Sequence, residues 1–268
     1  MEIIGYFGAL LMGLTLGLIG GGGSILTVPI LVYLFSVDAV LATAYSLFIV
    51  GLTSLIGSFS HISQGNVHWK TAFVFGIPSI ISVYLTRLYL VPLIPAHIIT
   101  IGTFEVSKSI LILIFFALLM IVASYTMIKK NNNDEVKQPG EIAYNYPLIL
   151  VEGIVVGTIT GLVGAGGGFL IIPALVLLAK LPMKQAAGTS LVIIAMKSLI
   201  GFTGDLKGKE VIDWHFLGYF SVIAIVGIIV GSLLSKKVSD EKLKPAFGYF
   251  VLIMGVYIIL KEIFFQQL

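Results

Sequence analysis

Two copies of a glycine tract decide the fold of this chain: Gly17-Leu18-Ile19-Gly20-Gly21-Gly22-Gly23-Ser24, and 144 positions later Gly161-Leu162-Val163-Gly164-Ala165-Gly166-Gly167-Gly168. A proline follows each tract at the same distance, at Pro29 and Pro173. Glycines at this density break a helix and leave successive backbone N–H groups free to face a ligand. The tracts therefore predict two helix breaks that offer N–H donors to a small anion.

The tracts belong to a longer internal repeat. At the offset of 144, 19 of the 45 positions from Gly13 to Gly57 are identical to their partners, and no gap is needed. Chance would give only a few identities, so we interpret the pattern as an internal duplication. Repeats of this kind in membrane transporters place the substrate at their interface, near the middle of the membrane.

The composition is that of a polytopic membrane protein. Of the 268 residues, 58% are hydrophobic and 11% are charged, and the mean hydropathy is +1.08. The net charge of +3 is small and spread over several short loops, which argues against a nucleic-acid partner and leaves the lipid bilayer as the expected surroundings. There is no cysteine, which excludes disulfides, thiolate metal sites and thiol catalysis. We expect the first apolar segment to be retained, because it lacks the basic start of a signal peptide.

The apolar segments fall into two sets of five. They lie at about 3–19, 24–36, 40–60, 71–91 and 106–128, and then at about 146–163, 168–180, 185–203, 215–235 and 243–265. A charged, Asn- and Pro-containing stretch separates the sets. The expected organisation is a first membrane repeat at 1–128, a hydrophilic linker at 129–145 and a second membrane repeat at 146–268. The fold class is all-α.

The length around each break predicts a helical hairpin. The 34 residues from Ile3 to Ser36 would span about 51 Å as one straight helix, against a hydrocarbon core of about 30 Å. If the chain turns back at each glycine tract, each half has five segments and the two repeats are inverted.

The basic residues favour the hairpins. The hairpin arrangement puts ten lysines on one side of the membrane and five basic residues on the other, whereas single crossings divide them seven to eight. The ten are Lys70, Lys129, Lys130, Lys137, Lys180, Lys184, Lys236, Lys237, Lys242 and Lys244, and the five are Arg87, Lys108, Lys207, Lys209 and Lys261. Because cytoplasmic loops are rich in Lys and Arg, we expect both termini outside and the linker in the cytoplasm of a cell-membrane protein.

The repeated motifs resemble the sulfite exporter TauE/SafE family of membrane transporters. The first copy carries Gly17 to Gly23, Pro29, Ala42, Ser46, Leu47 and Gly65-Asn66-Val67-His68-Trp69, and the second carries Gly161 to Gly168, Pro173, Ala186, Ser190, Leu191 and Val211-Ile212-Asp213-Trp214. The resemblance covers essentially the whole chain. It implies transport of small sulfur-containing anions such as sulfite, thiosulfate, sulfonates or sulfoacetate. The copies differ where Ser24 stands opposite Gly168, so the two half-sites are not equivalent.

The substrate site is expected between the two breaks. Helices that start near Ser24 and Phe169 would direct free N–H groups and positive dipole ends toward an anion at mid-depth. The backbone donors are those of Gly21, Gly22, Gly23 and Ser24 in the first tract and of Gly166, Gly167 and Gly168 in the second. The alternative is that these glycines only allow close helix packing.

The third segment of each half supplies polar side chains. Ser46, Thr53 and Ser54 correspond to Ser190, Lys197 and Ser198, and we expect Ser46, Ser190 and Lys197 to contact the substrate. Lys197 lies deep in an apolar span, where a cation needs water, a partner or a ligand. It could instead extend toward the loop at 204–213 or pair structurally with Glu152.

Glu152 is a candidate for proton coupling, with an interfacial carboxylate as the alternative. The four histidines lie at segment ends or in loops and form no metal-ligand pattern, so no metal, cofactor or catalytic residue is expected.

The predicted function is a secondary transporter of small sulfur-containing anions that works by alternating access, driven by a proton or by the substrate gradient. A passive anion channel is the first alternative, and an integral membrane enzyme or assembly factor is the second. The sequence leaves the transported species, the direction and the oligomeric state open.

Overall fold

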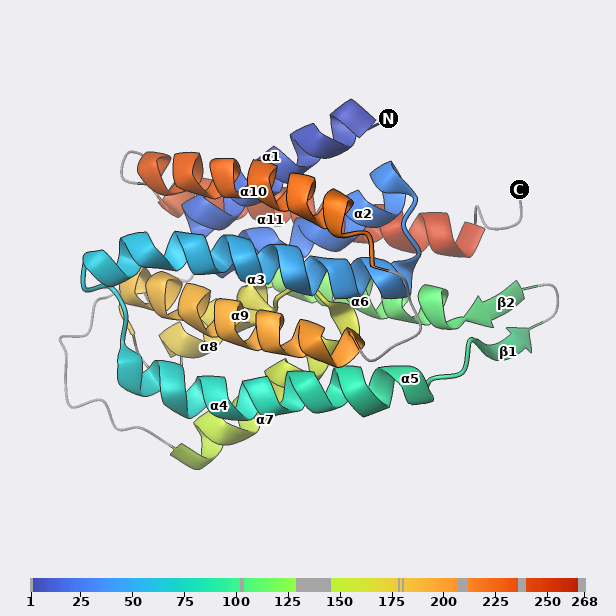
Figure 1. The fold of residues 1–268 in the computed structure, drawn as a ribbon, viewed down its shortest axis with the longest axis horizontal. Coiled ribbons are helices and arrows are strands. Elements are labelled where there is room, and N and C mark those ends of the chain that lie inside the picture. Colours follow the sequence, from blue (N-terminus) through green and yellow to red (C-terminus); the bar gives the residue numbers. More distant parts are fainter. Residues whose placement is uncertain are drawn as a thin grey trace.

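The computed structural model describes residues 2–101, 104–128, 146–177, 179, 181–206, 212–235 and 240–264. This part of the chain is helical except for one small β hairpin (Figure 1). The first half contains α1 Glu2–Ile19, the 3₁₀ helix η1 Gly21–Leu26, α2 Thr27–Phe35, α3 Ala39–Ser63, α4 Trp69–Leu85, the π-helical turn η2 Thr86–Leu90, α5 Val91–Leu93, β1 His97–Ile101, β2 Phe104–Ser107 and α6 Lys108–Ile128. The second half contains α7 Tyr146–Val163, α8 Gly168–Leu177, α9 Met183–Asp205, α10 Trp214–Leu234 and α11 Asp240–Phe264. The linker expected at 129–145 lies outside the described residues.

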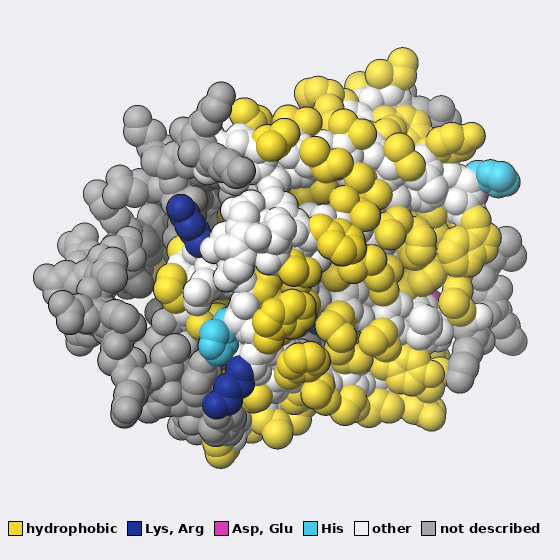
Figure 2. Space-filling view, turned by 60° about the vertical axis from the view of Figure 1, so that its left-hand side comes forward, with side chains coloured by type: hydrophobic (Ala, Val, Ile, Leu, Met, Phe, Trp, Pro, Cys, Tyr) yellow, Lys and Arg dark blue, Asp and Glu magenta, His cyan; other side chains and the backbone are white. Residues whose placement is uncertain are grey.

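The described helices have the length and the surface of membrane spans. Five of those within the described ranges are long and apolar enough to cross a bilayer: Ala39–Ser63, Trp69–Leu93, Lys108–Tyr125, Met183–Asp205 and Trp214–Leu234. Hydrophobic side chains cover most of the described surface visible in Figure 2, and large apolar residues such as Phe7, Val122, Tyr219 and Ile253 are exposed. In water such a surface would aggregate. The chain is therefore a multi-pass, all-α membrane protein.

At the first glycine tract the chain turns back on itself. Gly5 of α1 packs against Phe35 at the end of α2, Gly8 packs against Ile30, and Gly23 packs against the backbone of Leu16. Because residue numbers rise on one side of this contact while they fall on the other, α1 and α2 are antiparallel. The first break therefore forms the hairpin expected from the length of this segment.

The first helix of each half packs against the helix formed by the fourth apolar segment of the other half. Gly13 and Gly17 of α1 touch the backbone of α10 at Ala224 and Ile228. At the repeat offset of 144, Gly157 and Gly161 of α7 pack in the same way against the backbone of α4 at Ser79 and Val83. Both pairs are parallel, and both depend on glycine to bring two backbones into contact.

The helices α3 and α9 cross at the centre as an antiparallel pair. Gly51 packs against Leu199, Gly57 packs near Leu191, and Gly201 packs near Leu47. Since α9 is the repeat partner of α3, equivalent helices run in opposite directions here (Figure 1). The crossing lies where Thr53 and Lys197, which also correspond in the repeat, are nearly opposite each other.

The β hairpin is a feature that the segment analysis did not predict. β1 and β2 pair antiparallel between the fourth and fifth predicted segments of the first half. In Figure 1 they lie at the same end of the molecule as the start of α1 and the end of α11. This end also holds the α2–α3 connection, whereas the turn between α3 and α4 lies at the opposite end.

Candidate functional site

The two glycine tracts meet at the centre of the molecule. The backbones of Gly21 and Gly168 are in contact, and a side chain added to either residue would overlap the other backbone. Gly166 lies beside Ser24 and also beside Val50 and Ile194 of the crossing helices. Thus the structure brings together Gly21 and Ser24 of the first tract with Gly166 and Gly168 of the second, although the tracts are 144 positions apart in the sequence.

Glycine conformation makes both breaks possible. Gly20 and Gly164 occupy equivalent positions with φ of 77° and 75°, and Gly166 and Gly167 have φ of 65° and 64°. These left-handed values are strained for residues with a side chain. Gly164 and Gly166 to Gly168 also lie so close to other segments of the protein that a Cβ atom at any of these positions would overlap them.

The first short helix begins earlier than expected. We expected helical geometry to start near Ser24, but η1 starts at Gly21 and includes Gly21, Gly22, Gly23 and Ser24. Its glycines adopt a tight 3₁₀ turn because residues without a side chain accept the closer packing of i and i+3. Since the first N–H groups of a helix have no acceptor within it, the free donors are those of the first glycines rather than those that follow Ser24.

The second short helix starts at the expected place. α8 begins at Gly168, and the N–H groups of Leu170 and Ile171 donate to the carbonyl oxygen of Gly167 at 3.0 Å. Among the hydrogen bonds of the described residues, none uses the N–H of Gly166, Gly167 or Gly168. These three groups are the available donors at the second break.

Lys197 lies beside the second break and is fully buried. Its side chain has 0% exposure, and Nζ donates a hydrogen bond to Thr160 Oγ1 at 2.9 Å. A Cβ atom on Gly167 would lie 2.8 Å from Nζ. In the described part of the chain no carboxylate lies within ion-pair distance of this ammonium group. The amino group of Lys197 thus faces the glycine tract with one neutral partner.

Neither alternative for Lys197 is seen as a contact among the described residues. The side chain is fully buried, and its amino group contacts Thr160 on α7. Glu152 is partly buried and lies eight residues before Thr160, about 12 Å along α7. Within the described ranges, no ion pair joins Glu152 to Lys197.

The serines predicted for the site have different surroundings. Ser24 Oγ donates to the carbonyl oxygen of Gly21 at 2.8 Å, and Ser190 Oγ donates to that of Ala187 at 2.8 Å. Ser46 is buried, and its hydroxyl has no hydrogen-bond partner among the described residues. The register of α3 against α9 places Ser46 and Ser190 toward opposite ends of the crossing, roughly 15 Å apart or more along the helices. One small anion cannot contact both in this conformation.

Three other hydroxyl groups lie closer to the crossing. Thr53, Ser54 and Ser198 are fully buried, and their oxygen atoms have no hydrogen-bond partner in the described part of the structure. Ser54 and Ser198 are equivalent in the repeat, as are Thr53 and Lys197. The alignment identified this correspondence, but the expected site omitted these three residues because their depth depends on the α3–α9 register.

A second buried cation, Arg87, was not expected in the site. The sequence analysis counted it among the basic residues that flank the membrane, but its side chain is buried between four helices. Nε pairs with Asp205 Oδ2 at 2.8 Å, and Nη1 donates to Thr43 Oγ1 at 3.0 Å and to the carbonyl oxygen of Gly161 at 3.1 Å. The available signal was the position of an arginine inside the apolar segment 71–91.

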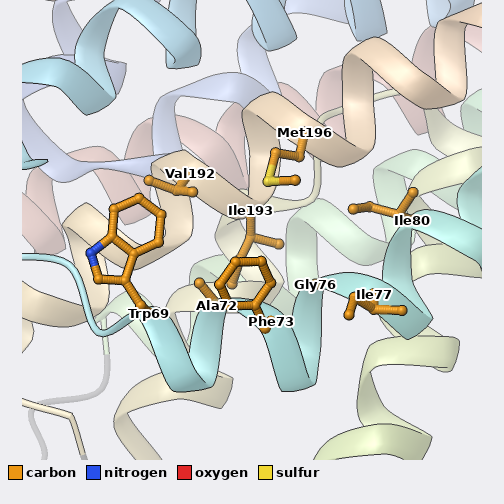
Figure 3. Close-up of a pocket in the computed structure, with 9 residues that line it drawn as sticks. All are labelled: Trp69, Ala72, Phe73, Gly76, Ile77, Ile80, Val192, Ile193 and Met196. Carbon is orange, nitrogen blue, oxygen red and sulfur yellow. The ribbon is translucent and has the colours of Figure 1, made fainter.

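Two hollows lined by residues that the structure describes both lie away from the glycine tracts. One is an apolar hollow between α4 and α9, with Trp69, Phe73, Ile77 and Met196 on its walls (Figure 3). The other is an open depression near Tyr89 and Thr158. An apolar hollow of this kind on a membrane protein suits lipid chains better than an anion, so we do not place the substrate there.

Comparison with known proteins gives consistent results across the chain. A profile of the family described as Sulfite exporter TauE/SafE matches residues 6–258. A probable membrane transporter protein of Xylella fastidiosa strain 9a5c is 29% identical over 253 residues, which cover 93% of this chain and 91% of that protein. A probable membrane transporter protein of Methanocaldococcus jannaschii is 28% identical over 263 residues, with 93% and 92% covered. No solved structure matches the chain.

Proposed function

Since the chain belongs to the sulfite exporter TauE/SafE family and is a membrane transporter, we propose that it moves small sulfur-containing anions by alternating access. The anions we have in mind are sulfite, thiosulfate, sulfonates and sulfoacetate. In this proposal the substrate binds where the two glycine tracts meet, and the protein has no enzymatic activity.

The observation that carries the proposal is the buried amino group of Lys197, which a bound anion would hold in its charged form. Removing a charge from water costs several kcal/mol unless a partner compensates it. One threonine hydroxyl does not neutralise the charge, whereas an anion would. The free N–H groups at Gly166 to Gly168 supply hydrogen bonds without adding further charge, and the unpaired hydroxyls of Thr53, Ser54 and Ser198 supply additional donors near the crossing.

The arrangement of helices supports alternating access. The antiparallel α3–α9 pair and the matching contacts of α1 with α10 and of α7 with α4 fit two inverted repeats. In such proteins one repeat moves against the other around a fixed site. We propose that the repeats are 1–128 and 146–268, with both termini outside and the linker at 129–145 in the cytoplasm.

We also propose that Glu152 takes part in proton coupling, and this role is tested separately. Its distance along α7 from Thr160 means that it would act on the transport cycle rather than by direct contact with Lys197. Measuring transport with and without a proton gradient in Glu152→Gln tests this role. Unchanged dependence on the gradient would remove it.

Replacing Lys197 by methionine tests the site. Lys197→Met keeps an unbranched side chain that is one atom shorter and removes its charge, so we expect it to abolish the thermal stabilisation that wild-type protein gains from sulfite or thiosulfate. Sulfate, phosphate and acetate complete the panel. Lys184→Gln is the matched control, because Lys184 is an exposed lysine on the same helix. Wild-type anion affinity in a folded Lys197→Met protein would exclude the proposed role.

Transport measurements separate a transporter from a channel. An alternating-access transporter reconstituted in proteoliposomes should show saturable uptake that is accelerated by unlabelled anion on the opposite side. A passive channel would show neither effect. An enzyme or assembly factor would show no net anion flux.

A further inference from the structure

We propose that Arg87 forms a second anion-binding position, on the path between Lys197 and the end of the molecule where α9 ends, and that Asp205 is the resident counter-ion which an arriving anion displaces. The inference rests on the proposed transport function. It adds a residue and an order of events: the anion first exchanges with Asp205 at Arg87 and then moves inward to Lys197.

The guanidinium group of Arg87 has unused donors in a buried place. Arginine has five N–H groups, and three hydrogen bonds are formed, by Nε to Asp205 and by Nη1 to Thr43 and Gly161. Nη2 has no partner in the described structure, although the residue is only 1% exposed. A buried donor without a partner is costly. An oxyanion would supply the missing acceptor, because guanidinium binds such oxygens in a fixed, often bidentate geometry.

The position of Arg87 links it to the Lys197 site. Arg87 binds the carbonyl oxygen of Gly161, and Lys197 binds the hydroxyl of the preceding residue, Thr160. Asp205 follows Lys197 by eight residues on α9, about 12 Å farther along the helix. The Asp205 side chain is 18% exposed, whereas that of Arg87 is 0% exposed. Asp205, Arg87 and Lys197 therefore form a series from the end of α9 inward.

The local backbone is adapted to hold the arginine. Arg87 lies in the π-helical turn η2, a type of irregularity that is frequent at functional sites. Gly204 allows α9 to approach, because a Cβ atom at that position would lie 3.0 Å from the Arg87 Cβ. The guanidinium is thus fixed against Thr43, Gly161 and Asp205 at once.

A purely structural ion pair is the competing explanation, and Asp205→Asn measured alone and together with Arg87→Gln separates the two. If Asp205 competes with the anion for Arg87, its neutralisation should lower the anion concentration for half-maximal thermal stabilisation about tenfold, equivalent to about 1.4 kcal/mol, and this gain should vanish when Arg87 is also replaced. If the pair only locks η2 to α9, any gain comes from the charge removed near Lys197 and should persist when Arg87 is also replaced.

The experiment uses purified full-length protein titrated with sodium thiosulfate and sodium sulfite. Arg87→Gln should raise the half-maximal concentration about tenfold, since one charged hydrogen-bonding group is lost. The double variant Arg87→Gln with Asp205→Asn replaces the pair by two neutral side chains of similar size, and it should bind as weakly as Arg87→Gln. If Asp205→Asn alone does not fold, wild-type affinity of the double variant would overturn the proposal.

Two further results separate this inference from the transport proposal. If neither anion stabilises the wild-type protein, the proposed function fails first. If wild-type protein responds, Lys197→Met does not, and every folded Arg87 and Asp205 variant behaves as wild type, then only the second position is wrong. Lys184→Gln again controls for the loss of a positive charge.

Discussion

At the scale of single residues, Gly167 is constrained both by its backbone conformation and by its contacts with neighbouring side chains. Its φ of 64° favours glycine, and a Cβ atom there would meet both Thr160 and Lys197. Gly65 in the α3–α4 turn has nearly the same φ, 67°, but nothing lies within 4 Å of its Cβ position. Gly167 thus has both constraints, as Gly164 and Gly166 do, whereas Gly65 has the conformational constraint alone.

Alanine at these two positions should have different effects. Gly65→Ala should cost about 1 kcal/mol of stability, the price of left-handed geometry for a residue with a Cβ. Gly167→Ala should cost about 2–4 kcal/mol, because overlap with Thr160 adds to the strain, and it should weaken anion binding by displacing Lys197. Thermal unfolding in detergent, with and without thiosulfate, measures both effects. Equal destabilisation by the two substitutions, with anion binding intact, would contradict this reading of Gly167.

At the scale of elements, glycine contacts hold α1 against α10. Gly13→Ala would push a methyl group into the carbonyl of Ala224 and should lower stability by about 1–3 kcal/mol. Gly218→Ala on α10 is the control, because no atom lies within 4 Å of its Cβ position and alanine favours helix. We expect that variant to be at least as stable as wild type. Thermal unfolding compares the two, and a neutral Gly13→Ala would mean that the helices are not in close backbone contact.

The same elements show what the sequence could and could not predict. The helix positions could be predicted from the lengths of the apolar segments. The contact between the two glycine tracts could be predicted from the internal duplication. The extent of the first short helix was misjudged, since glycines that break an α-helix can still form a 3₁₀ turn. Arg87 was not among the expected substrate contacts because its partners come from other helices. The hydroxyls of Thr53, Ser54 and Ser198 were not among them because their burial near the crossing depends on helix register, which is a tertiary property.

At the scale of the whole molecule, near-symmetric packing surrounds an asymmetric centre. Helix pairs correspond between the halves, yet Thr53 stands where the second half has Lys197, and Leu16 stands where it has Thr160. Lys197 is the only buried lysine among the described residues, so at the proposed site the anion would be held mainly by the second half. Rocking of the first half would then open the site to either side while the anion stays attached to α9.

The arrangement of the ends makes a prediction about topology that labelling can test. The β hairpin and the ends of α1 and α11 lie at one end of the molecule, and the α3–α4 turn lies at the other (Figure 1). Because the chain has no cysteine, Thr100→Cys in the hairpin and Gln64→Cys in the turn each introduce a single thiol at an exposed position. We expect a membrane-impermeant maleimide to label Thr100→Cys in intact cells, and Gln64→Cys only after the membrane is opened.

Arg87 is buried and does not contribute to the charge at the surface, so the excess of lysines on the Gln64 side is larger than the sequence count suggested, which favours this orientation. The reverse labelling pattern would mean that the protein has the opposite orientation in the membrane, with the hairpins unchanged. Labelling of both positions from one side would contradict the inverted arrangement itself.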